Sequence, residues 1–554
     1  MAITNPSNLA RRPNRRVFGW TLLVGLLMLS MSIPPAIASS GSSQSQSLPT
    51  LFPRSNPPPS TVYLVKPRPQ LGTEVAALEG LVARDKPQIY TSNTANDLFW
   101  FTYTMQNYGL KYTTISDTSA LQMFKSYVTD SQNGKIKIIL YASKDPISPA
   151  QSNMAVTLAG VYGALPVASG DLSTVQSVFG SSNLETLYNL QGMFSSKITA
   201  YQWLWNLVGS QVTRSFVSTT PDGGEGMADY IVQHKSFDFE FTNSGSMNSA
   251  EQTAATTILS NYPKGTPVMG FFGFGFEPNT ITFLSQLGLF MTPSDSASNL
   301  SFFSGLPEAM NLKQVSPASS LSYSSSKVYL AITYSQGNSL GYMFNGNRMI
   351  WDDKDSKGNY YRQEIPENFQ INPTLAELAP PVLQYWYSTM YSDDYFVAAT
   401  SGGAGYVHPD QLPNLATYIS ESGAFSNNAG ISVYTIDPGV HKVQTSLYQQ
   451  FITGTGATAI MTKQPHGGLP SVVDGTPVFE MTYKVDSITS YSSSDVNSAA
   501  NSIISLGKSQ HFIWVFMNAK NPGQGFLQAL LAKLGPNYVA VRADQFTSLY
   551  LQSK

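Results

Sequence analysis

The sequence predicts an α/β protein in which small N-terminal α/β domains precede a C-terminal (β/α) barrel-like domain. Two observations lead to this fold class. From Thr61 onward, short apolar runs typical of strands alternate with stretches whose apolar residues recur at helical spacing. The chain has 554 residues, of which 42% are hydrophobic, and this is enough for several domains at about 150 residues each.

Residues 1–38 have the pattern of a signal peptide. Arginines between Arg11 and Arg16 precede an apolar run that reaches Ile33, and small residues follow, ending at Ala38. We expect cleavage after Ala38. The alternative is an uncleaved membrane anchor, because the run approaches the length of a span, about 17–25 residues. The Arg15-Arg16 pair resembles the twin-arginine export motif, with the general export route as the alternative. Cleavage and anchoring alike place the rest of the chain outside the membrane, secreted or at the cell surface.

Three small domains are expected after a tether. Residues 39–60 are rich in Ser, Gln and Pro and should bury little, so order is expected to begin with the strand Thr61–Val65. The domains are expected over residues 61–168, 169–228 and 229–311. Their expected strands and helices lie at 71–83, 87–90, 95–107, 119–129, 135–141, 154–162, 166–168, 267–272 and 280–287.

The Ser-rich stretch 312–326 predicts a boundary before a last domain over residues 327–554. Strands are expected there at 328–333, 395–399, 431–435, 478–482, 512–516 and 539–542, with helices at 379–390, 411–420, 444–452, 496–506 and 525–534. A repeat of strand, polar loop and helix is the pattern of a (β/α) barrel. We expect this domain to have a core of its own.

Composition excludes several classes of protein. Lys and Arg total 32 against 34 Asp and Glu, so the basic excess of nucleic-acid-binding and polybasic membrane-surface proteins is missing. The membrane is expected as a partner only through an uncleaved N-terminal segment. The chain has no Cys and 5 His, which excludes thiolate sites and disfavours a His-rich metal cluster; we expect neither metal nor cofactor. A weakly charged surface rich in hydroxyl and amide groups suits neutral ligands such as sugars.

A Gly-rich segment, residues 401–409, is the densest motif. It contains Gly403, Gly405, Tyr406 and His408 and follows the expected strand 395–399. In a barrel this is the carboxyl end of a strand, where ligand groups are presented. We expect a ligand to lie against this segment, with Tyr406 stacking on it and His408 donating a hydrogen bond. The alternative is a tight turn that binds nothing.

The motif resembles the signature of the GxGYxYP putative glycoside hydrolase family, with His408 where the family has Tyr. Other segments resemble the family in the right order: 78–87, 268–270 with Glu277 and 299–301, 375–380, 511–513 and 541–546. The resemblance covers about residues 62–554. It implies secretion, small α/β N-terminal domains, a C-terminal barrel and glycoside hydrolase activity on a carbohydrate.

One departure from the family concerns two carboxylates. Members typically carry Ser-Asp-Gly-Asp-Asn after the first strand of the last domain, and the matching run here is 335–339, with Gln336 and Asn338 at the Asp positions. An amide cannot act as a general base. Gln336 and Asn338 could still bind a sugar, because amides donate to and accept from hydroxyls.

The catalytic candidates are three carboxylates. Glycoside hydrolysis needs two carboxyl groups flanking the scissile bond. Asp437 follows the strand 431–435, Glu480 lies within a strand and is expected to point into the barrel, and Asp394 precedes the strand that leads to the Gly-rich segment. Two hypotheses stay open: an exported glycoside hydrolase-like enzyme, and a non-catalytic carbohydrate- or envelope-binding protein with a degenerate barrel. Two close carboxyl groups in the barrel mouth would favour the enzyme.

Overall fold

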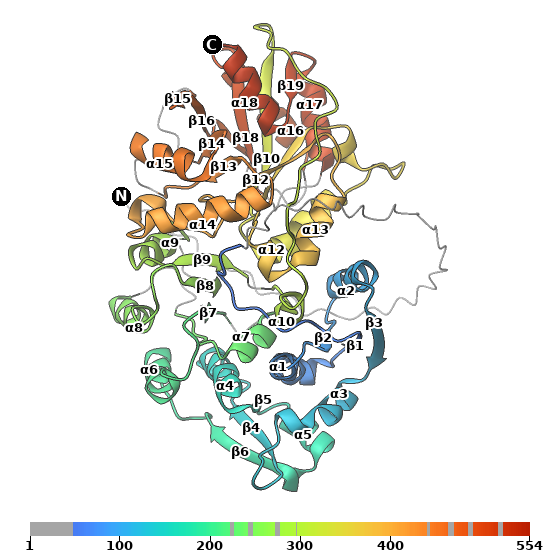
Figure 1. Cartoon of the computed structure of the whole chain (residues 1–554), viewed down its shortest axis with the longest axis vertical. Coiled ribbons are helices and arrows are strands. Elements are labelled where there is room, and N and C mark those ends of the chain that lie inside the picture. The colour runs from blue at the N-terminus through green and yellow to red at the C-terminus, as the bar shows by residue number, and fades with distance from the viewer. Residues whose placement is uncertain are drawn as a thin grey trace, which may run out of the picture. The chain divides into compact units, whose positions relative to one another are not determined.

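Four sheets, built almost entirely of parallel strands, form the framework of the chain (Figure 1). This computed structural model describes residues 48–221, 226–241, 248–271, 277–294, 296–439, 444–463, 470–485, 491–518 and 524–554. Leu48–Lys554 forms one compact unit. The expected signal segment, residues 1–38, lies outside the described residues. Among the residues that are described, no helix is both long and apolar enough to cross a membrane.

The first sheet has the order β2-β1-β3 and parallel pairing throughout. Its strands are β1 (Thr61–Val65), β2 (Ile89–Thr91) and β3 (Lys111–Ile115), and its helices are α1 (Gly72–Ala83), α2 (Ala95–Tyr108) and α3 (Asp117–Met123). A capping box between Thr94 and Asp97 starts α2, and Gly109, in the left-handed conformation, ends it. Because β1 is central, the two strands that follow it in sequence lie on its opposite sides.

The second sheet has the order β5-β4-β6 and is also parallel. It contains β4 (Ile136–Tyr141), β5 (Leu165–Ala168) and β6 (Leu184–Asn189), with α4 (Ser148–Tyr162), α5 (Leu172–Phe179) and α6 (Lys197–Val208). The expected boundary after residue 168 therefore separates β6 from the two strands of its own sheet.

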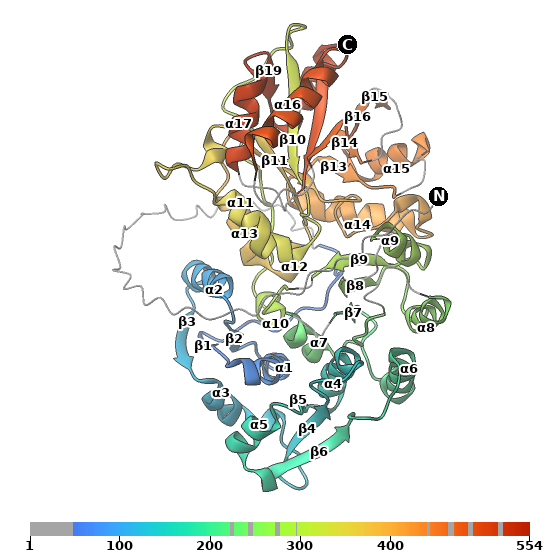
Figure 2. The ribbon, with the colours of Figure 1, turned by 180° about the vertical axis from the view of Figure 1, so that it is seen from behind.

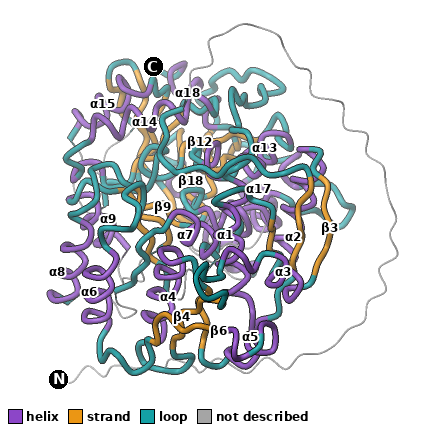
Figure 3. Tube along the Cα trace, turned by 60° about the horizontal axis from the view of Figure 1, so that its bottom comes forward, coloured by secondary structure: helices purple, strands orange, loops and turns teal. Residues whose placement is uncertain are grey.

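The third sheet has the order β7-β8-β9. It contains β7 (Val217–Thr219), β8 (Pro267–Gly270) and β9 (Phe290–Pro293), with α7 (Ala228–His234), α8 (Ser249–Leu259), α9 (Glu277–Gln286) and α10 (Leu300–Phe303). Helix α6, which follows the second sheet, lies beside α8 of the third sheet (Figure 3). The expected boundary after residue 228 falls inside α7, which packs on α1: a Cβ on Gly80 would stand 2.0 Å from the carbonyl oxygen of Asp229.

The C-terminal sheet follows the path β15-β16-β14-β13-β12-β11-β10-β18-β17, and β19 pairs with β10. All pairs are parallel except β15 with β16. Its strands are β10 (Val328–Tyr334), β11 (Glu367–Ile371), β12 (Asp394–Ala398), β13 (Val433–Ile436), β14 (Ala459–Thr462), β15 (Ser471–Val473), β16 (Thr476–Glu480), β17 (Tyr483–Val485), β18 (Phe512–Met517) and β19 (Tyr538–Ala540). Its helices are α11 (Asn347–Trp351), α12 (Leu375–Leu378), α13 (Pro380–Ser388), α14 (Leu415–Asn428), α15 (Thr445–Thr455), α16 (Ser493–Gly507), α17 (Gln524–Leu534) and α18 (Ala543–Gln552). Figure 2 shows α16 and α17 side by side.

This sheet curls into a half-barrel. Strand β16, next to one edge, leads directly into β17 at the other edge. Only Met481 and Thr482 separate β16 from β17. The Met481 amide donates to Thr462 O of β14 at 2.9 Å, and the Thr482 amide donates to Trp514 O of β18 at 3.1 Å. The α/β class and the parallel sheets are thus as expected, while a complete (β/α) barrel stays a prediction.

Alternate residues of the strands face two different clusters. The inner cluster includes Val433, Met461, Phe479 and Trp514 and is covered by α18 through residues such as Phe546. The outer face belongs to the main core, which the surrounding helices share. This alternation decides below which side chains can meet inside the curled sheet.

Part of the expected tether is packed rather than free. Leu51 and Phe52 are buried, and their backbone amides donate to Glu377 Oε2 of α12 at 3.2 and 3.3 Å. Arg54 forms an ion pair with Glu308 at 2.5 Å. Composition hid this apolar pair inside a Ser- and Pro-rich stretch, so packed structure is already present at Leu51, ahead of Thr61.

The expected linker 312–326 contains neither helix nor strand, but it lies along the C-terminal sheet and its helices. The Leu312 amide donates to Asn428 O at 2.9 Å, and Gln314 Nε2 donates to Phe396 O at 3.0 Å. The Tyr323 amide donates to Gln552 Oε1 at 2.9 Å. The stretch is therefore fixed at both ends.

Candidate active site at the carboxyl edge of the C-terminal sheet

The Gly-rich loop, residues 401–409, follows β12 and joins the C-terminal sheet to the third one. The Tyr406 amide donates to Met291 O of β9 at 2.7 Å, and the Met291 amide donates back to Tyr406 O at 3.0 Å. Gly405 lies so close to this strand that a Cβ would stand 2.2 Å from the Phe290 ring. Gly403 has φ 115°, a conformation that favours glycine. The glycines therefore serve a tight turn and a close backbone approach.

Tyr406 is buried within this junction. Its side chain is 3% exposed and packs among residues of the second and third sheets. The expectation that its ring stacks on a ligand is not met, because protein already covers the ring. What the residue presents is its hydroxyl, which donates to Asp437 Oδ2 at 3.3 Å.

His408 is also buried, at 0% exposure, and its partners are protein groups. Its Nδ1 lies 2.8 Å from the Thr282 hydroxyl of α9, and its backbone amide donates to Ser285 Oγ of α9 at 3.0 Å. Its ring fills the space beside Gly439, just after Asp437. His408 therefore fastens α9 to the loop that carries Asp437, and it has no open side from which to donate to a ligand.

Asp437 lies at the carboxyl end of β13 and, by alternation from Val433, on the inner face. Lys463 Nζ, just after β14, lies 3.0 Å from its Oδ2, and the Gly439 amide donates to its Oδ1 at 3.0 Å. Burial alone would raise the pKa of Asp437, but the charges of Lys463 and His408 lower this pKa below its ordinary value. Asp437 is thus held ionised at neutral pH.

A second carboxylate reaches the same place from another domain. Glu277 is the first residue of α9. Burial, followed by the charges of Asp437 and Glu277, raises the pKa of Tyr406 well above its ordinary value, so both carboxylates lie near its hydroxyl. Sequence reasoning placed Glu277 in a family-like segment but gave it no role, since Glu277 and Asp437 lie far apart in the chain.

Amide and hydroxyl groups line the neighbouring strand ends. Gln336 is half-buried at φ 70°, and Asn338 is buried, with its carbonyl 3.5 Å from Asn372 Nδ2. This loop lies against the end of β11, because a Cβ on Gly337 would stand 1.6 Å from Gln370 O. Gln370 Nε2 is buried with no hydrogen-bond partner among the described residues.

The other two predicted carboxylates lie elsewhere. Glu480 alternates with Phe479 of the inner cluster and so faces outward, toward Tyr448 on α15, whose pKa is raised by burial and, to a smaller extent, by the charge of Glu480. Asp394 is the first residue of β12, at the amino end, where it is fully buried against Arg362 at 2.6 Å. Neither can join Asp437, because one lies on the wrong face and the other at the wrong end. In the part of the chain that the structure describes, no group of three His, Cys, Asp or Glu could hold a metal ion.

Comparisons with known proteins agree with this architecture. The chain matches the GxGYxYP putative glycoside hydrolase C-terminal domain over residues 326–551, the GxGYxYP third domain over 213–305 and the GxGYxYP_N first domain over 69–126. A crystal structure described as a putative hydrolase from Bacteroides thetaiotaomicron is similar in fold, with a TM-score of 0.76 at 22% identity over 90% of this chain and 96% of that one. No curated protein matches the chain significantly. Three domain models match in their expected order, and the chain belongs to the GxGYxYP family.

Proposed function

We propose that this protein is an exported hydrolase that cleaves a carbohydrate at the carboxyl edge of the curled sheet. The observation that carries the proposal is the presence of two carboxylates beside the hydroxyl of Tyr406: Asp437, which accepts its hydrogen bond, and Glu277, whose charge acts on it. Two carboxyl groups about 5–5.5 Å apart are the arrangement that retaining glycoside hydrolases use. Membership of a glycoside hydrolase-like family and the fold of a hydrolase neighbour support the same reaction class.

The two carboxylates take different roles in this proposal. Asp437, which Lys463 holds ionised, attacks the anomeric carbon and forms a covalent glycosyl intermediate. Glu277 protonates the leaving glycosidic oxygen and then takes a proton from the water that releases the sugar. Tyr406 positions Asp437, and amides such as Gln370 and Asn372 bind sugar hydroxyls.

The second candidate function is carbohydrate binding without cleavage. Gln336 and Asn338 favour it, because they supply amides where relatives carry carboxylates. The binder would use the same polar strand ends, with the Asp437–Lys463 pair as a structural contact.

Cleavage of a panel of purified polysaccharides, followed through the new reducing ends, separates the two candidates. We expect the wild type to cleave at least one of them and Asp437→Asn or Glu277→Gln to lower the rate by about 10²–10⁴-fold. Asp474→Asn, in an exposed turn, is the matched control. Retardation in gels containing the same polysaccharides reports binding. Binding without cleavage would identify the binder, and equal rates in Asp437→Asn and wild type would remove Asp437 from the reaction.

Export remains part of the proposal. The basic, apolar and small-residue segments of residues 1–38 support a mature chain that begins at Ser39. N-terminal sequencing of secreted material checks it, and full-length chain in the membrane fraction would favour the anchor.

A further inference from the structure

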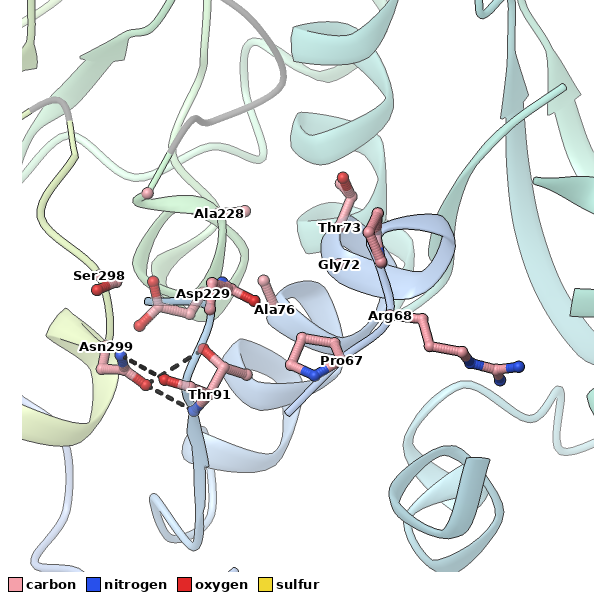
Figure 4. A pocket seen from close by; sticks show the side chains of 13 residues that line it. Pro67, Arg68, Gly72, Thr73, Ala76, Thr91, Ala228, Asp229, Ser298 and Asn299 are labelled. Carbon is pink, nitrogen blue, oxygen red and sulfur yellow. Dashed lines mark hydrogen bonds between the residues drawn. The ribbon is translucent and has the colours of Figure 1, made fainter. Parts of the chain in front are cut away.

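A separate pocket of about 450 Å³ lies outside the carboxyl ends of β1 and β2 (Figure 4). The chain passes from β1 to β2 on one side and then to β3 on the other. Open parallel sheets usually bind ligands in a crevice outside the carboxyl ends of their strands. None of the pocket's residues belongs to the candidate active site.

One wall of the pocket is the first turn of α1, with Gly72, Thr73 and Ala76. No side chain caps this helix, so amides of its first turn are available to a ligand. Arg68 also belongs to the wall, but its guanidinium is bound to Asp117, with Nε 2.8 Å from Oδ2. Figure 4 shows this guanidinium directed away from the other labelled residues.

The opposite wall contains Thr91, Asp229, Ser298 and Asn299. Asn299 is fixed by Thr91, whose amide donates to its Oδ1 at 2.7 Å. Asp229 Oδ2 accepts from the amide and hydroxyl of Ser301 at 2.8 and 2.7 Å. Its Oδ1 has no hydrogen-bond partner among the described residues, although Asp229 is only 2% exposed.

Charge restricts what can bind between these walls. Burial raises the pKa of Asp229 to about 6, so this wall carries negative charge at neutral pH. Ser298 Oγ donates to a second carboxylate, Asp97, at 2.5 Å. With Arg68 already paired, a phosphate or other anion would meet repulsion without a compensating cation.

A hydroxyl-rich neutral molecule satisfies both walls. Its hydroxyls can donate to carboxylate and amide oxygens on one side and accept from the α1 amides and the Thr73 hydroxyl on the other. Pro67, Ala76 and Ala228 supply small apolar surfaces for C–H groups. We propose that this pocket binds a single sugar unit, as a non-catalytic site separate from Asp437 and Glu277. The proposal stands whether or not the chain is a hydrolase.

Saturation-transfer NMR and calorimetry on the full chain carrying Asp437→Asn test this site without turnover. The probes are a panel of neutral hexoses, glucosamine and inorganic phosphate. We expect at least one neutral hexose to bind and phosphate not to bind. Ala76→Leu, which fills the pocket, should raise its Kd at least 10-fold, and Thr73→Val, which removes a hydroxyl at nearly constant volume, should raise it several-fold.

Ala532→Leu, on an exposed face of α17, is the matched control and should leave the Kd unchanged. Thermal unfolding of each variant checks that the fold is kept. The proposal is overturned if no neutral hexose binds, if Ala76→Leu and Thr73→Val leave its Kd unchanged, or if phosphate or glucosamine alone occupies the pocket. Loss of cleavage in Asp437→Asn with hexose binding intact would show that the two sites are independent.

Discussion

At the scale of single residues, Lys463 decides the charge state of Asp437. Its ammonium lies 3.0 Å from the carboxylate and over the Phe516 ring at 5.1 Å. Because this pairing keeps the pKa of Asp437 below its unfolded value of about 3.9, it stabilises the fold above that pH. The stabilisation is lost as the pH falls through the lower, folded pKa.

Replacing the cation should therefore cost stability in a pH-dependent way. We expect Lys463→Met to lower the free energy of unfolding by about 1–3 kcal/mol at pH 7, since it leaves a buried charge unpaired. The loss should shrink as the pH falls, because the variant protonates Asp437 at a higher pH than the wild type does. Urea unfolding at pH 7 and pH 4 measures both effects, with Lys508→Met at an exposed position as control. A pH-independent loss would contradict the assigned pairing.

Two substitutions at Tyr406 distinguish the contribution of its ring to stability from the contribution of its hydroxyl to the reaction. Tyr406→Ala should cost about 3–5 kcal/mol in unfolding free energy, because removing this buried aromatic ring leaves a cavity. Tyr406→Phe keeps the ring and should cost about 1 kcal/mol, yet it should slow carbohydrate cleavage by removing the contact to Asp437. Chemical denaturation and rate measurement on the same preparations test this. If Tyr406→Ala were as stable as the wild type, the ring would be exposed to solvent and not buried.

The residues also show where sequence reasoning stops. The position of Asp437 at the carboxyl edge of the sheet could be predicted, because it directly follows an apolar strand. Glu480 could not be assigned correctly, since a shift of one position along a strand reverses the face. Glu277 escaped because only tertiary packing of α9 against the Gly-rich loop brings it to Asp437.

At the scale of elements, the Gly-rich loop works as a joint between two sheets. Gly405→Ala would drive a Cβ into the Phe290 ring, so we expect the Tyr406–Met291 pairing to break and stability to fall by about 1–3 kcal/mol. Gly456→Ala is the control, since Gly456 has φ 71° but open space around it; about 1 kcal/mol is expected there. Equal losses at the two positions would argue against the joint.

Most strands could be predicted because their apolar runs are distinct, as with β1 and β18. Strand β11 could not, because Asn368 and Gln370 alternate with its apolar residues. The Asn368 side chain forms two buried hydrogen bonds: its Oδ1 accepts from the Ala543 amide at 2.6 Å, and its Nδ2 donates to Ile332 O at 2.9 Å. A strand that places amides on a buried inner face has no clear hydrophobic signal.

At the scale of the whole molecule, the segment 48–60 ties the first domains to the C-terminal sheet. It contacts Glu377 through Leu51 and Phe52, and Pro53 O accepts from the Tyr230 hydroxyl of α7 at 2.5 Å. Composition suggested a free tether because two apolar residues weigh little in a window of Ser and Pro.

Removing this segment should loosen the assembly. A chain that begins at Leu48 should unfold in one transition at the wild-type temperature. A chain that begins at Thr61 loses two buried apolar side chains, worth about 1.5–3 kcal/mol each, and should unfold at a lower temperature. Calorimetry on both chains measures the difference, and identical transitions would show that the segment is dispensable.

The pairing of β10 with β18 and β19 has a consequence for the order of folding. All seven residues of β10 are buried, yet Tyr329 finds its partner Phe512 only near the end of the chain. At a synthesis rate of about 5–20 residues/s, this partner emerges roughly 10–40 s later. Such long-range closure gives a high contact order and slow folding, so the curled sheet cannot be completed until translation is almost finished, and β10 depends until then on protection from aggregation.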